Sequence, residues 1–536
     1  MDSKSIIRIA AVVSAMFLIS FGIWHAPLPF GDEGGYINDA IHLNNNHAYS
    51  INPYLDFYKF ILSVICSDPV YAHYIARLVV SLVSAIGMLF LLDSISMIRS
   101  NCAKIITLAL WISSYAVTPK AQFGNVNLFT FDLILIGLVP LLRKQSTARI
   151  IFFMTMLLWA CQIRTEYYIA FVLFLTYFLV FIFLKIKDIY KSFLSGATCF
   201  SAFLLAISVF LIVYDRSRTE KYIEHDSLLI FGQHYASYYV RVHKDAGVSA
   251  MAEYKTVLDK MFNTPKSVPE ALKNNPVEAA RFLLNNFSRN CVIVVPALLR
   301  HRPLFIPEKY EKRGECVEIA VILAILAFGG FMGIRSLGFG KTAGYLVSLS
   351  KNCKLHFFIL LSSSMIIAMV MLIPDTRYYL PIAPILFSGI ALIIQYMIGK
   401  LRFKMKIALI FIICIWLCHP YFIAQSNDHQ IVLKMREEAK KIQHEPQITC
   451  LSPASIATFA FGTRFKFIPE SEFTMESITA LRYDFIVVNK YFRESSYWAK
   501  DKEGFTRFEK NPEEYGYSLL GSSNDRHEMN VYVKSR

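Results

Sequence analysis

Long apolar runs separated by short polar segments fill most of this 536-residue chain. About twenty apolar residues in a helix are enough to cross the hydrocarbon core of a bilayer. The pattern therefore predicts an α-helical polytopic membrane protein with about eleven transmembrane helices, the first of them retained rather than cleaved as a signal peptide. Their approximate bounds are 6–24, 70–92, 102–117, 126–142, 148–163, 166–186, 192–214, 317–335, 355–373, 379–399 and 405–423.

Basic residues distribute unequally between the two sides that these helices define. With a cytoplasmic N-terminus, the inner loops carry eighteen Lys and Arg, and the short outer loops carry four, Lys59, Lys120, Arg164 and Arg377. Cytoplasmic loops are enriched in Lys and Arg, so this bias predicts an N-terminus inside and a C-terminus outside. The eighteen are Lys4, Arg8, Arg99, Lys104, Arg143, Lys144, Arg149, Lys185, Lys187, Lys191, Arg335, Lys341, Lys351, Lys354, Lys400, Arg402, Lys404 and Lys406.

Three outer segments are long, at 25–69, 215–316 and 425–536. The first holds a pair of carboxylates and an aromatic stretch typical of the membrane interface, from Tyr54 to Phe60. The second contains the apolar run Val292 to Leu299, which is too short to span and is expected to lie along the membrane or to re-enter it. The sequence thus divides into a membrane domain, 1–424, with its outer loops 25–69 and 215–316, and a C-terminal domain, 425–536.

The C-terminal domain has the pattern of a small α/β unit. A helical face behind a possible Asn427 cap is expected from the spacing of Ile431, Met435, Ala439 and Ile442. A helix-like stretch precedes Tyr483. Strands are predicted at Gln447–Leu451, Phe485–Val488, Tyr517–Leu520 and Asn530–Val533.

Composition excludes several classes of function. The chain is 55% hydrophobic and 18% charged, and its net charge of +15 would suit nucleic acid binding. The basic residues, however, cluster in short loops between apolar runs, so we expect no nucleic acid partner. The ten Cys are scattered without metal-ligand or disulfide spacing. No metal site is predicted, although a divalent cation bound by carboxylates stays open.

The candidate chemistry begins directly behind the first apolar run, in Phe30-Gly31-Asp32-Glu33-Gly34-Gly35-Tyr36. Two adjacent carboxylates at the outer membrane surface suit an active site that faces a membrane-embedded substrate. The alternative is structural, because Asp32 could cap a helix that runs through Ile37, Ala40 and Ile41.

Further charged groups are predicted at the same outer face. Each has a structural alternative: Arg77 could snorkel, Arg164 and Glu166 could form a surface ion pair, and Tyr378 and Tyr379 could belong to an aromatic belt. Asp132, inside the fourth span, is expected to bond between helices. Convergence of the others on one face favours a site for an anionic substrate. The converging residues are Asp32, Glu33, Arg77, Arg164, Glu166, Asp375, Arg377 and Tyr378.

These residues resemble those of the GT-C membrane glycosyltransferases, and more narrowly the protein O-mannosyltransferase and lipid A aminoarabinose transferase group. The resemblance lies in Asp32-Glu33 behind the first span, in Ala76-Arg77-Leu78, in Arg377-Tyr378 before Pro381, and in the outward α/β domain. The sequence departs from the group at Gly34-Gly35, where larger residues are usual, and at Arg164, where Lys is common. Asn52-Pro53 stands in place of a His-Pro-Pro motif.

The resemblance implies a glycosyltransferase of a bacterial inner membrane with a polyprenyl-phosphate sugar donor. It implies that the acceptor lies in the periplasm and is a glycan or lipid-linked acceptor such as lipopolysaccharide. It also implies direct displacement at the anomeric carbon, which inverts its configuration. On this basis we expect Asp32 to act as the general base and Glu33 to orient the acceptor. Arg377 is the first candidate cation for the lipid phosphate, with Arg77 and Arg164 behind it. No cofactor is expected.

Two other functions stay open from the sequence. An O-antigen polymerase or ligase would depend on Arg218, His234 and Arg241 in the long outer loop and would not need Asp32-Glu33. A transporter of lipid-linked sugars would usually show inverted repeats and polar groups near the midplane, whereas here the polar groups gather at one face and no repeat is visible.

The topology is testable by cysteine labelling. Cysteines at Ser100 and Leu401 should react with an impermeant reagent only after the membrane is permeabilised, because both positions lie within basic loops that are predicted to face the cytoplasm. Cysteines at Asn274 and Ser522 should react from outside in intact cells. Labelling of Leu401 from outside would overturn the predicted number of spans.

Overall fold

The protein is described by a computed structural model in which most of the chain is helical. For residues 32–34 and 376–378 the description covers the backbone alone. The structure describes residues 32–46, 52–114, 124–144, 146–164, 166–184, 196–219, 223–243, 254–299, 353–371, 376–399, 427–449, 456–462, 464–468, 474–493, 496–523 and 529–535, with single positions 13, 16, 19, 28, 50 and 117.

Eight of the predicted spans coincide with helices. The predicted runs 6–24, 317–335 and 405–423 lie wholly or almost wholly outside the described residues. In the described part of the chain, four helices are long and apolar enough to cross a membrane, those in α4, α6, α10 and α18. The eight are α4 (Pro69–Ser94), α5 (Asn101–Ser113), α6 (Gly124–Arg143), α7 (Thr147–Ile163), α8 (Tyr167–Leu184), α10 (Gly196–Thr219), α17 (Cys353–Met371) and α18 (Ala383–Gly399).

Side-chain caps start several of these helices. The carboxylate of Asp68 accepts from the Val70 amide at the start of α4, and the hydroxyls of Ser100 and Ser146 do the same for α5 and α7. Each cap satisfies a backbone donor that has no partner within its helix. The fifth and sixth predicted spans are two separate helices, because α7 ends at Ile163, before Arg164, and α8 begins at Tyr167.

Polar contacts at the end of the bundle predicted to face the cytoplasm join α4, α5 and α18. The Gln395 side chain of α18 accepts from the Arg99 and Ser100 amides, at 2.6 and 2.8 Å, and donates to the Met97 carbonyl. Lys104 of α5 pairs with Asp93 of α4. The C-terminal ends of α4 and α18 therefore meet the start of α5, as alternating spans require.

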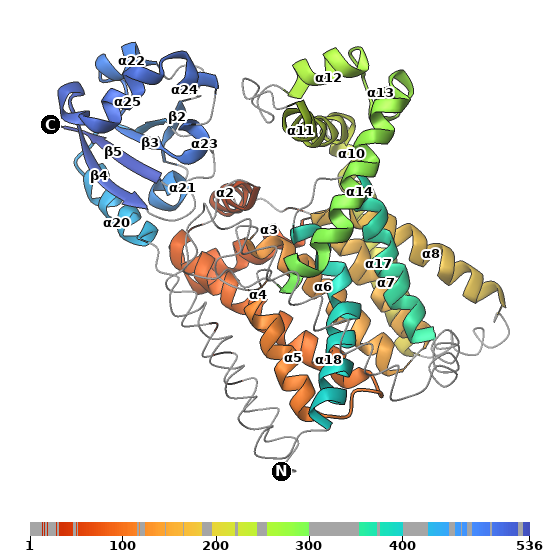
Figure 1. The fold of residues 1–536 in the computed structure, drawn as a ribbon. Helices are drawn as coiled ribbons and strands as arrows, with labels where there is room; N and C mark the ends of the chain where they lie inside the picture. The colour runs from red at the N-terminus through yellow and green to blue at the C-terminus, as the bar shows by residue number, and fades with distance from the viewer. Residues whose placement is uncertain are drawn as a thin grey trace.

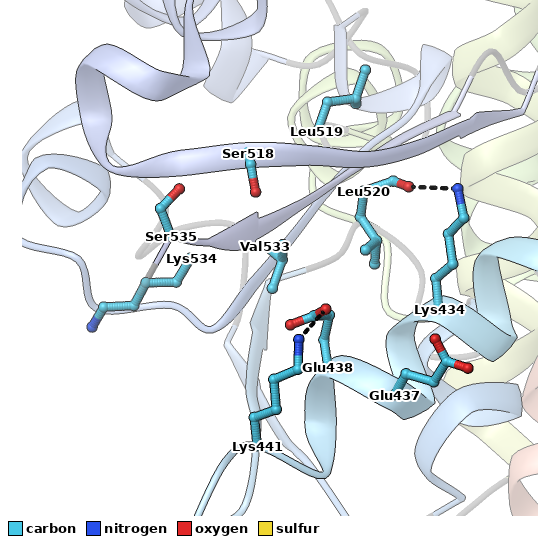
Figure 2. Close-up of a pocket in the computed structure, with 10 residues that line it drawn as sticks. All are labelled: Lys434, Glu437, Glu438, Lys441, Ser518, Leu519, Leu520, Val533, Lys534 and Ser535. Carbon is cyan, nitrogen blue, oxygen red and sulfur yellow. Dashed lines mark hydrogen bonds and ion pairs between the residues drawn. The ribbon is translucent and has the colours of Figure 1, made fainter.

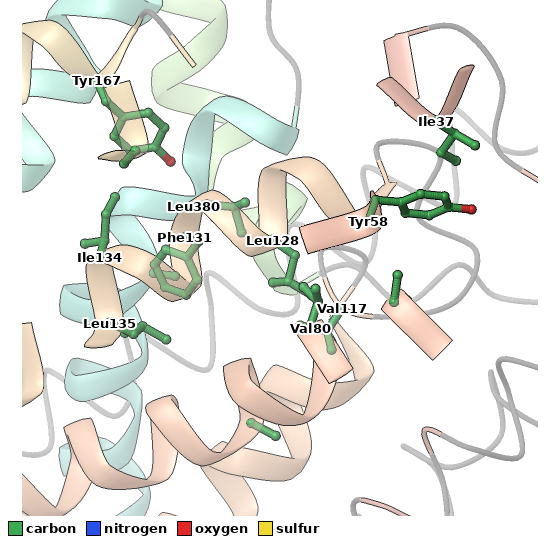
Figure 3. Packing of buried hydrophobic residues seen from close by; sticks show 14 of the residues in the cluster. Ile37, Tyr58, Val80, Val117, Leu128, Phe131, Ile134, Leu135, Tyr167 and Leu380 are labelled. Atoms are coloured by element: carbon green, nitrogen blue, oxygen red, sulfur yellow. The ribbon is translucent and has the colours of Figure 1, made fainter. Parts of the chain in front are cut away.

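The core of the bundle is built around α6. Figure 3 shows Leu128, Phe131, Ile134 and Leu135 of α6 among buried side chains from other helices, including Val80 and Leu380. A side chain on Gly137 would lie 3.0 Å from the Phe153 Cα of α7, so glycine permits the close approach of these two helices. Buried Leu, Ile and Phe side chains of this kind each contribute about 1.5–3 kcal/mol.

Short helices cover the opposite, predicted outer end of the bundle. α2 (Asp32–Asn45), α3 (Pro53–Phe60) and the π-helix η1 (Ile61–Ile65) lie across the ends of α4 and α6, and η2 (Thr376–Ile382) leads into α18. A second group, α11 (Ile223–His243), α12 (Tyr254–Phe262) and α13 (Val268–Asn274), packs around Tyr235 and Phe282. α14 (Pro276–Leu299) contains the apolar run Val292 to Leu299 and contacts η2 and α17.

The C-terminal residues form a five-stranded mixed sheet with helices on both faces. Its order is β2-β1-β3-β5-β4, with β1 parallel to β2 and β3, and β5 antiparallel to β3 and β4. The predicted strands correspond to β1 (Gln447–Thr449), β3 (Phe485–Val488), β4 (Tyr517–Ser523) and β5 (Met529–Lys534), and β2 (Lys466–Ile468) was not predicted. The helices are α20 (Asp428–Ala439), α21 (Ile456–Phe461), α22 (Met475–Thr479), α23 (Lys490–Arg493), α24 (Ser496–Lys500), α25 (Lys502–Lys510) and the 3-10 helix η4 (Pro512–Tyr515).

We call residues 427–535 the sheet unit. α20 approaches β4 closely, since a side chain on Gly521 would lie 2.9 Å from Ile431. The predicted helical face of α20 is confirmed for Ile431, Met435 and Ala439, whereas Ile442 lies beyond the end of the helix, and the Asn427 side chain makes no capping hydrogen bond. In Figure 1 the sheet unit and the group α11–α13 lie at the same end of the bundle.

An ion pair joins the sheet unit to the bundle. Arg436 of α20 donates from Nη1 to Asp68 Oδ2 at 2.5 Å and also donates to the Phe459 and Ala460 carbonyls. Burial favours a higher pKa for the Asp68 carboxyl, but the hydrogen bonds from Arg436 and the Val70 amide outweigh burial and hold its pKa below the ordinary value. The contact therefore favours the ionised carboxylate.

This junction should weaken in acid. Because the folded-state pKa of Asp68 is lowered, its contribution to stability is complete above the unfolded-state value and is lost as pH falls below about 4. Asp68→Asn keeps the helix cap but removes the charge, so it should lower the melting temperature at pH 7 and abolish this part of the acid dependence. Melting in detergent across pH 7 to 3 measures both.

The exposed pair Arg507–Glu514 supplies the control. Glu514→Gln should leave the melting temperature nearly unchanged, because exposed ion pairs contribute little. An Asp68→Asn protein with the wild-type melting temperature and acid dependence would show that the pair does not hold the junction.

Candidate functional site

The acidic pair occupies the first turn of α2. The predicted helix is confirmed, since Ile37, Ala40 and Ile41 are buried along it, and Asp32 and Glu33 lie at the start of its described part. Carboxylates in the first turn are stabilised by the helix dipole. The acidic pair therefore lies at the end of α2 at which a helix favours negative charge.

Tyr36 fixes where that first turn lies. It follows Asp32 by four residues and Glu33 by three, so the three positions share one side of the helix. The Tyr36 hydroxyl donates to the Ile163 carbonyl at the end of α7, over 3.2 Å. The side of α2 that bears the acidic pair is thus held against the junction between α7 and α8.

An ion pair occupies that junction. Arg164 Nε donates to Glu166 Oε1 at 2.9 Å, and the two side chains are only 11% and 14% exposed. The surface ion pair considered from the sequence is therefore a largely buried one. Desolvation makes a buried charge costly without its partner, so each residue holds the other in place.

The segment with Arg377 and Tyr378 forms the 3-10 helix η2, which contacts α6, α14, α17 and α18. The next residue, Tyr379, is fully buried and donates to Asn290 Oδ1 of α14 at 2.6 Å. Tyr379 is therefore not part of an aromatic belt. The predicted site residue Asp375 lies outside the described residues, as do the side chains of Arg377 and Tyr378.

Arg289 adds a cation that the sequence analysis did not identify. It lies in α14 beside Tyr379, close enough for the two side chains to interact electrostatically. Arg289 forms no hydrogen bond or ion pair with any residue that the structure describes. Arg289 therefore lies beside the segment that carries Arg377 and is a further candidate cation for an anionic group. The sequence around Arg289 did not mark it as a site residue, because a single Arg in a long predicted outer loop is common.

Arg77 lies in a different environment, 4% exposed in the third turn of α4. His73, one turn earlier, and Tyr74 both interact with its charge, and Tyr74 also interacts with Asp428 of α20. The Arg77 side chain is buried, so it does not snorkel to the membrane surface. Its predicted role in phosphate binding stays a prediction.

Asp132 is buried in the middle of α6, away from the outer end of the bundle, at 3% exposure. Ser84 of α4 lies nearby and accepts from the Trp111 indole nitrogen of α5 at 3.2 Å. Three helices thus bring polar groups together at this level of the core. The burial of Asp132 agrees with a packing role, but neither carboxylate oxygen has a hydrogen-bond partner among the described residues, so the expected bond between helices is not seen.

The sheet unit carries an open cleft of about 490 Å³, between α20 and the strands β4 and β5 (Figure 2). Its charges are partly paired with one another, because Lys441 contacts Glu438 at 2.7 Å and Lys434 donates to the Leu520 carbonyl. In the part of the chain that the structure describes, no group of three or more His, Cys, Asp or Glu could hold a metal ion.

No protein-family model and no curated protein sequence matches this chain. ArnT from Cupriavidus metallidurans bound to undecaprenyl phosphate is similar over 98% of this chain and 97% of its own, with 10% identity and a TM-score of 0.42. The apo form of the same ArnT is similar over 99% of this chain and 98% of its own, with 10% identity and a TM-score of 0.40. A third similar structure is the oligosaccharyltransferase AglB from Archaeoglobus fulgidus in complex with an inhibitory peptide and a dolichol-phosphate. The similarity covers 90% of this chain and 69% of AglB, with 11% identity and a TM-score of 0.42.

ArnT and AglB are members of the GT-C superfamily, the superfamily that the sequence motifs resemble. Superpositions this loose assign neither residues nor a reaction to the present chain. The function proposed below therefore rests on the residues of this chain.

Arg289 yields a test of the cation that the structure adds. If it binds the phosphate of the donor, Arg289→Ala should lower kcat/KM for the donor by about ten- to a hundredfold, since hydrogen bonds to charged groups contribute roughly 1.5–3 kcal/mol. Steady-state transfer in nanodiscs measures this loss. Arg281→Ala is the matched control, because Arg281 lies on the same helix, is 70% exposed and pairs with Glu278 at 3.5 Å. Equal effects of the two changes would contradict the assignment.

Proposed function

We propose that this protein is an integral membrane glycosyltransferase that moves a sugar from a polyprenyl-phosphate-linked donor to a hydroxyl of a surface glycan acceptor. One observation supports it most. The first turn of α2, which bears Asp32 and Glu33, is held by Tyr36 beside the buried Arg164–Glu166 pair at the outer end of the bundle. A paired acid at a membrane surface is what transfer from a lipid-linked donor requires.

The reaction assigns a separate task to each carboxylate. Asp32 accepts the proton of the acceptor hydroxyl as its oxygen forms a bond to the anomeric carbon of the sugar. The bond from that carbon to the phosphate oxygen breaks at the same time, and its electron pair leaves with the polyprenyl phosphate. Attack opposite to the leaving group inverts the anomeric configuration. Glu33 orients the acceptor.

The leaving polyprenyl phosphate gains negative charge and needs a cation. Arg377 and Arg289 fit this task best, because η2 and α14 are in contact and a guanidinium binds phosphate through two parallel hydrogen bonds. Arg164 is already neutralised by Glu166, so we assign to that pair the support of the acidic turn rather than direct phosphate binding. Asp375 and Tyr378, on the same segment as Arg377, complete the donor site.

The proposed location is a bacterial inner membrane, with the reaction on the periplasmic side. There the sheet unit forms the periplasmic α/β domain, and lipopolysaccharide or a similar glycan serves as acceptor. No cofactor is assigned to the reaction.

The polymerase or ligase alternative gains less support from the structure. His234 is buried in α11, and Arg241 donates to Asn285 at 2.7 Å and lies over the Tyr238 ring. His234 is therefore not open to a substrate, and the exposed Arg241 is already engaged by α11 and α14.

Asp32→Asn separates the catalytic from the structural role of the acidic pair. Asn begins a helix about as well as Asp, so a purely structural role predicts a nearly silent change. A general base predicts a loss of about 10²–10⁴-fold in kcat, because Asn keeps size and hydrogen bonding but cannot accept the proton. Transfer of radiolabelled sugar from a polyprenyl-phosphate donor measures the rate.

Expression and melting temperature must be followed beside turnover, so that misfolding is not taken for lost chemistry. Glu33→Gln is the companion variant and should be milder if Glu33 only orients the acceptor. Near-normal transfer by well-folded Asp32→Asn would remove Asp32 from the mechanism.

A further inference from the structure

We propose that the sheet unit positions the acidic pair and that Asp428 is the positioning residue. The proposal rests on the proposed function, since it assumes that Asp32 and Glu33 carry out the chemistry. It adds a role for a part of the chain that lies about four hundred residues away in sequence.

A hydrogen bond joins the sheet unit to the chain just before the acidic pair. The Leu28 amide donates to Asp428 Oδ2 at 2.9 Å, and Leu28 and Asp428 are only 2% and 0% exposed. Asp428 is the first residue of α20, whereas Leu28 precedes Asp32 by four residues. Four residues of fully extended chain span at most about 14 Å, so the acidic pair lies on a short tether from this anchor.

The same unit also holds the chain after the acidic pair. Ile37, Ala40 and Ile41 of α2 belong to one buried cluster with Val432 of α20 and Phe459 of α21. A side chain added to Gly462, just after α21, would touch Ile41 at 3.9 Å. The sheet unit therefore lies close to the chain on both sides of the acidic turn in sequence, at Leu28 and at Ile41.

The anchor itself is rigidly connected to the bundle. Arg436, two turns after Asp428 on α20, pairs with Asp68 at the start of α4. Between them, the His429 ring packs edge-on against Tyr71 and Tyr74 of α4. Asp428 thus transmits the position of α4 to the segment that leads into Asp32.

Small displacements of a catalytic group are costly, and about 1 Å can reduce a rate about 10²-fold. We therefore expect Asp428→Ala to lower kcat by about ten- to a hundredfold while the KM for the donor changes little, because the phosphate cations lie elsewhere. Asp428→Asn keeps an oxygen that accepts from the Leu28 amide and should restore most of kcat. Hydrogen exchange should show the Leu28 amide protected in wild type and Asp428→Asn, and unprotected in Asp428→Ala.

Asp484→Ala is the matched control. Asp484 Oδ2 accepts from the Gln447 amide at the same distance, 2.9 Å, but inside the sheet unit. Its loss should lower stability without changing kcat or exchange at Leu28. All variants are tested as the full-length protein in nanodiscs, with polyprenyl-phosphate sugar as donor.

If Asp428→Ala does not fold, Asp428→Glu gives the answer, because it keeps the charge but moves the accepting oxygen by one methylene. Positioning predicts a lower kcat for a folded Asp428→Glu protein, and wild-type kcat would overturn the proposal. Wild-type kcat in folded Asp428→Ala, or equal losses in Asp484→Ala, would overturn it as well. An active Asp32→Asn would refute the proposed function instead, while exchange at Leu28 still reports whether the bond exists.

Discussion

The ion pair between Asp68 and Arg436 is the contact on which the arrangement of the outer end depends. Asp68 caps α4, and Arg436 binds the carbonyls that end α21, so one guanidinium links the start of a membrane helix to two helices of the sheet unit. About a quarter of each side chain remains exposed, so solvent screens part of the attraction. Because α20 is fixed there, its Asp428 lies where the Leu28 amide can bind it.

The sequence was sufficient for the eight predicted spans that fall within the described residues and insufficient for their contacts. Uninterrupted apolar runs predicted α4, α6 and α18 because twenty apolar residues leave few other structures possible. β2 escaped prediction because a strand of three residues, Lys466–Ile468, has no measurable alternation. The register of β4 was also beyond prediction. Its irregularity between Leu519 and Gly521 accommodates α20, which no local pattern encodes.

The candidate site divides in the same way. The placement of Asp32 and Glu33 behind an apolar run was visible in the sequence, because position relative to the membrane is a local property. Arg289 and Asp428 were not visible, since each matters only through a neighbour distant in sequence, Tyr379 in one case and Leu28 in the other. Tertiary contacts of this kind leave no periodic signal in either segment.

The coincidence of charges at one face, which first suggested a site, also separates into groups with different physical roles. Arg164 is neutralised by Glu166 at low exposure, so removing either residue leaves a costly buried charge. Arg289 is partly exposed and makes no hydrogen bond or ion pair with the residues that the structure describes. A guanidinium in that state gains most from a multiply charged phosphate, whereas one already paired gains little. The distinction between paired and unpaired cations, rather than their number, therefore indicates where the lipid phosphate would bind.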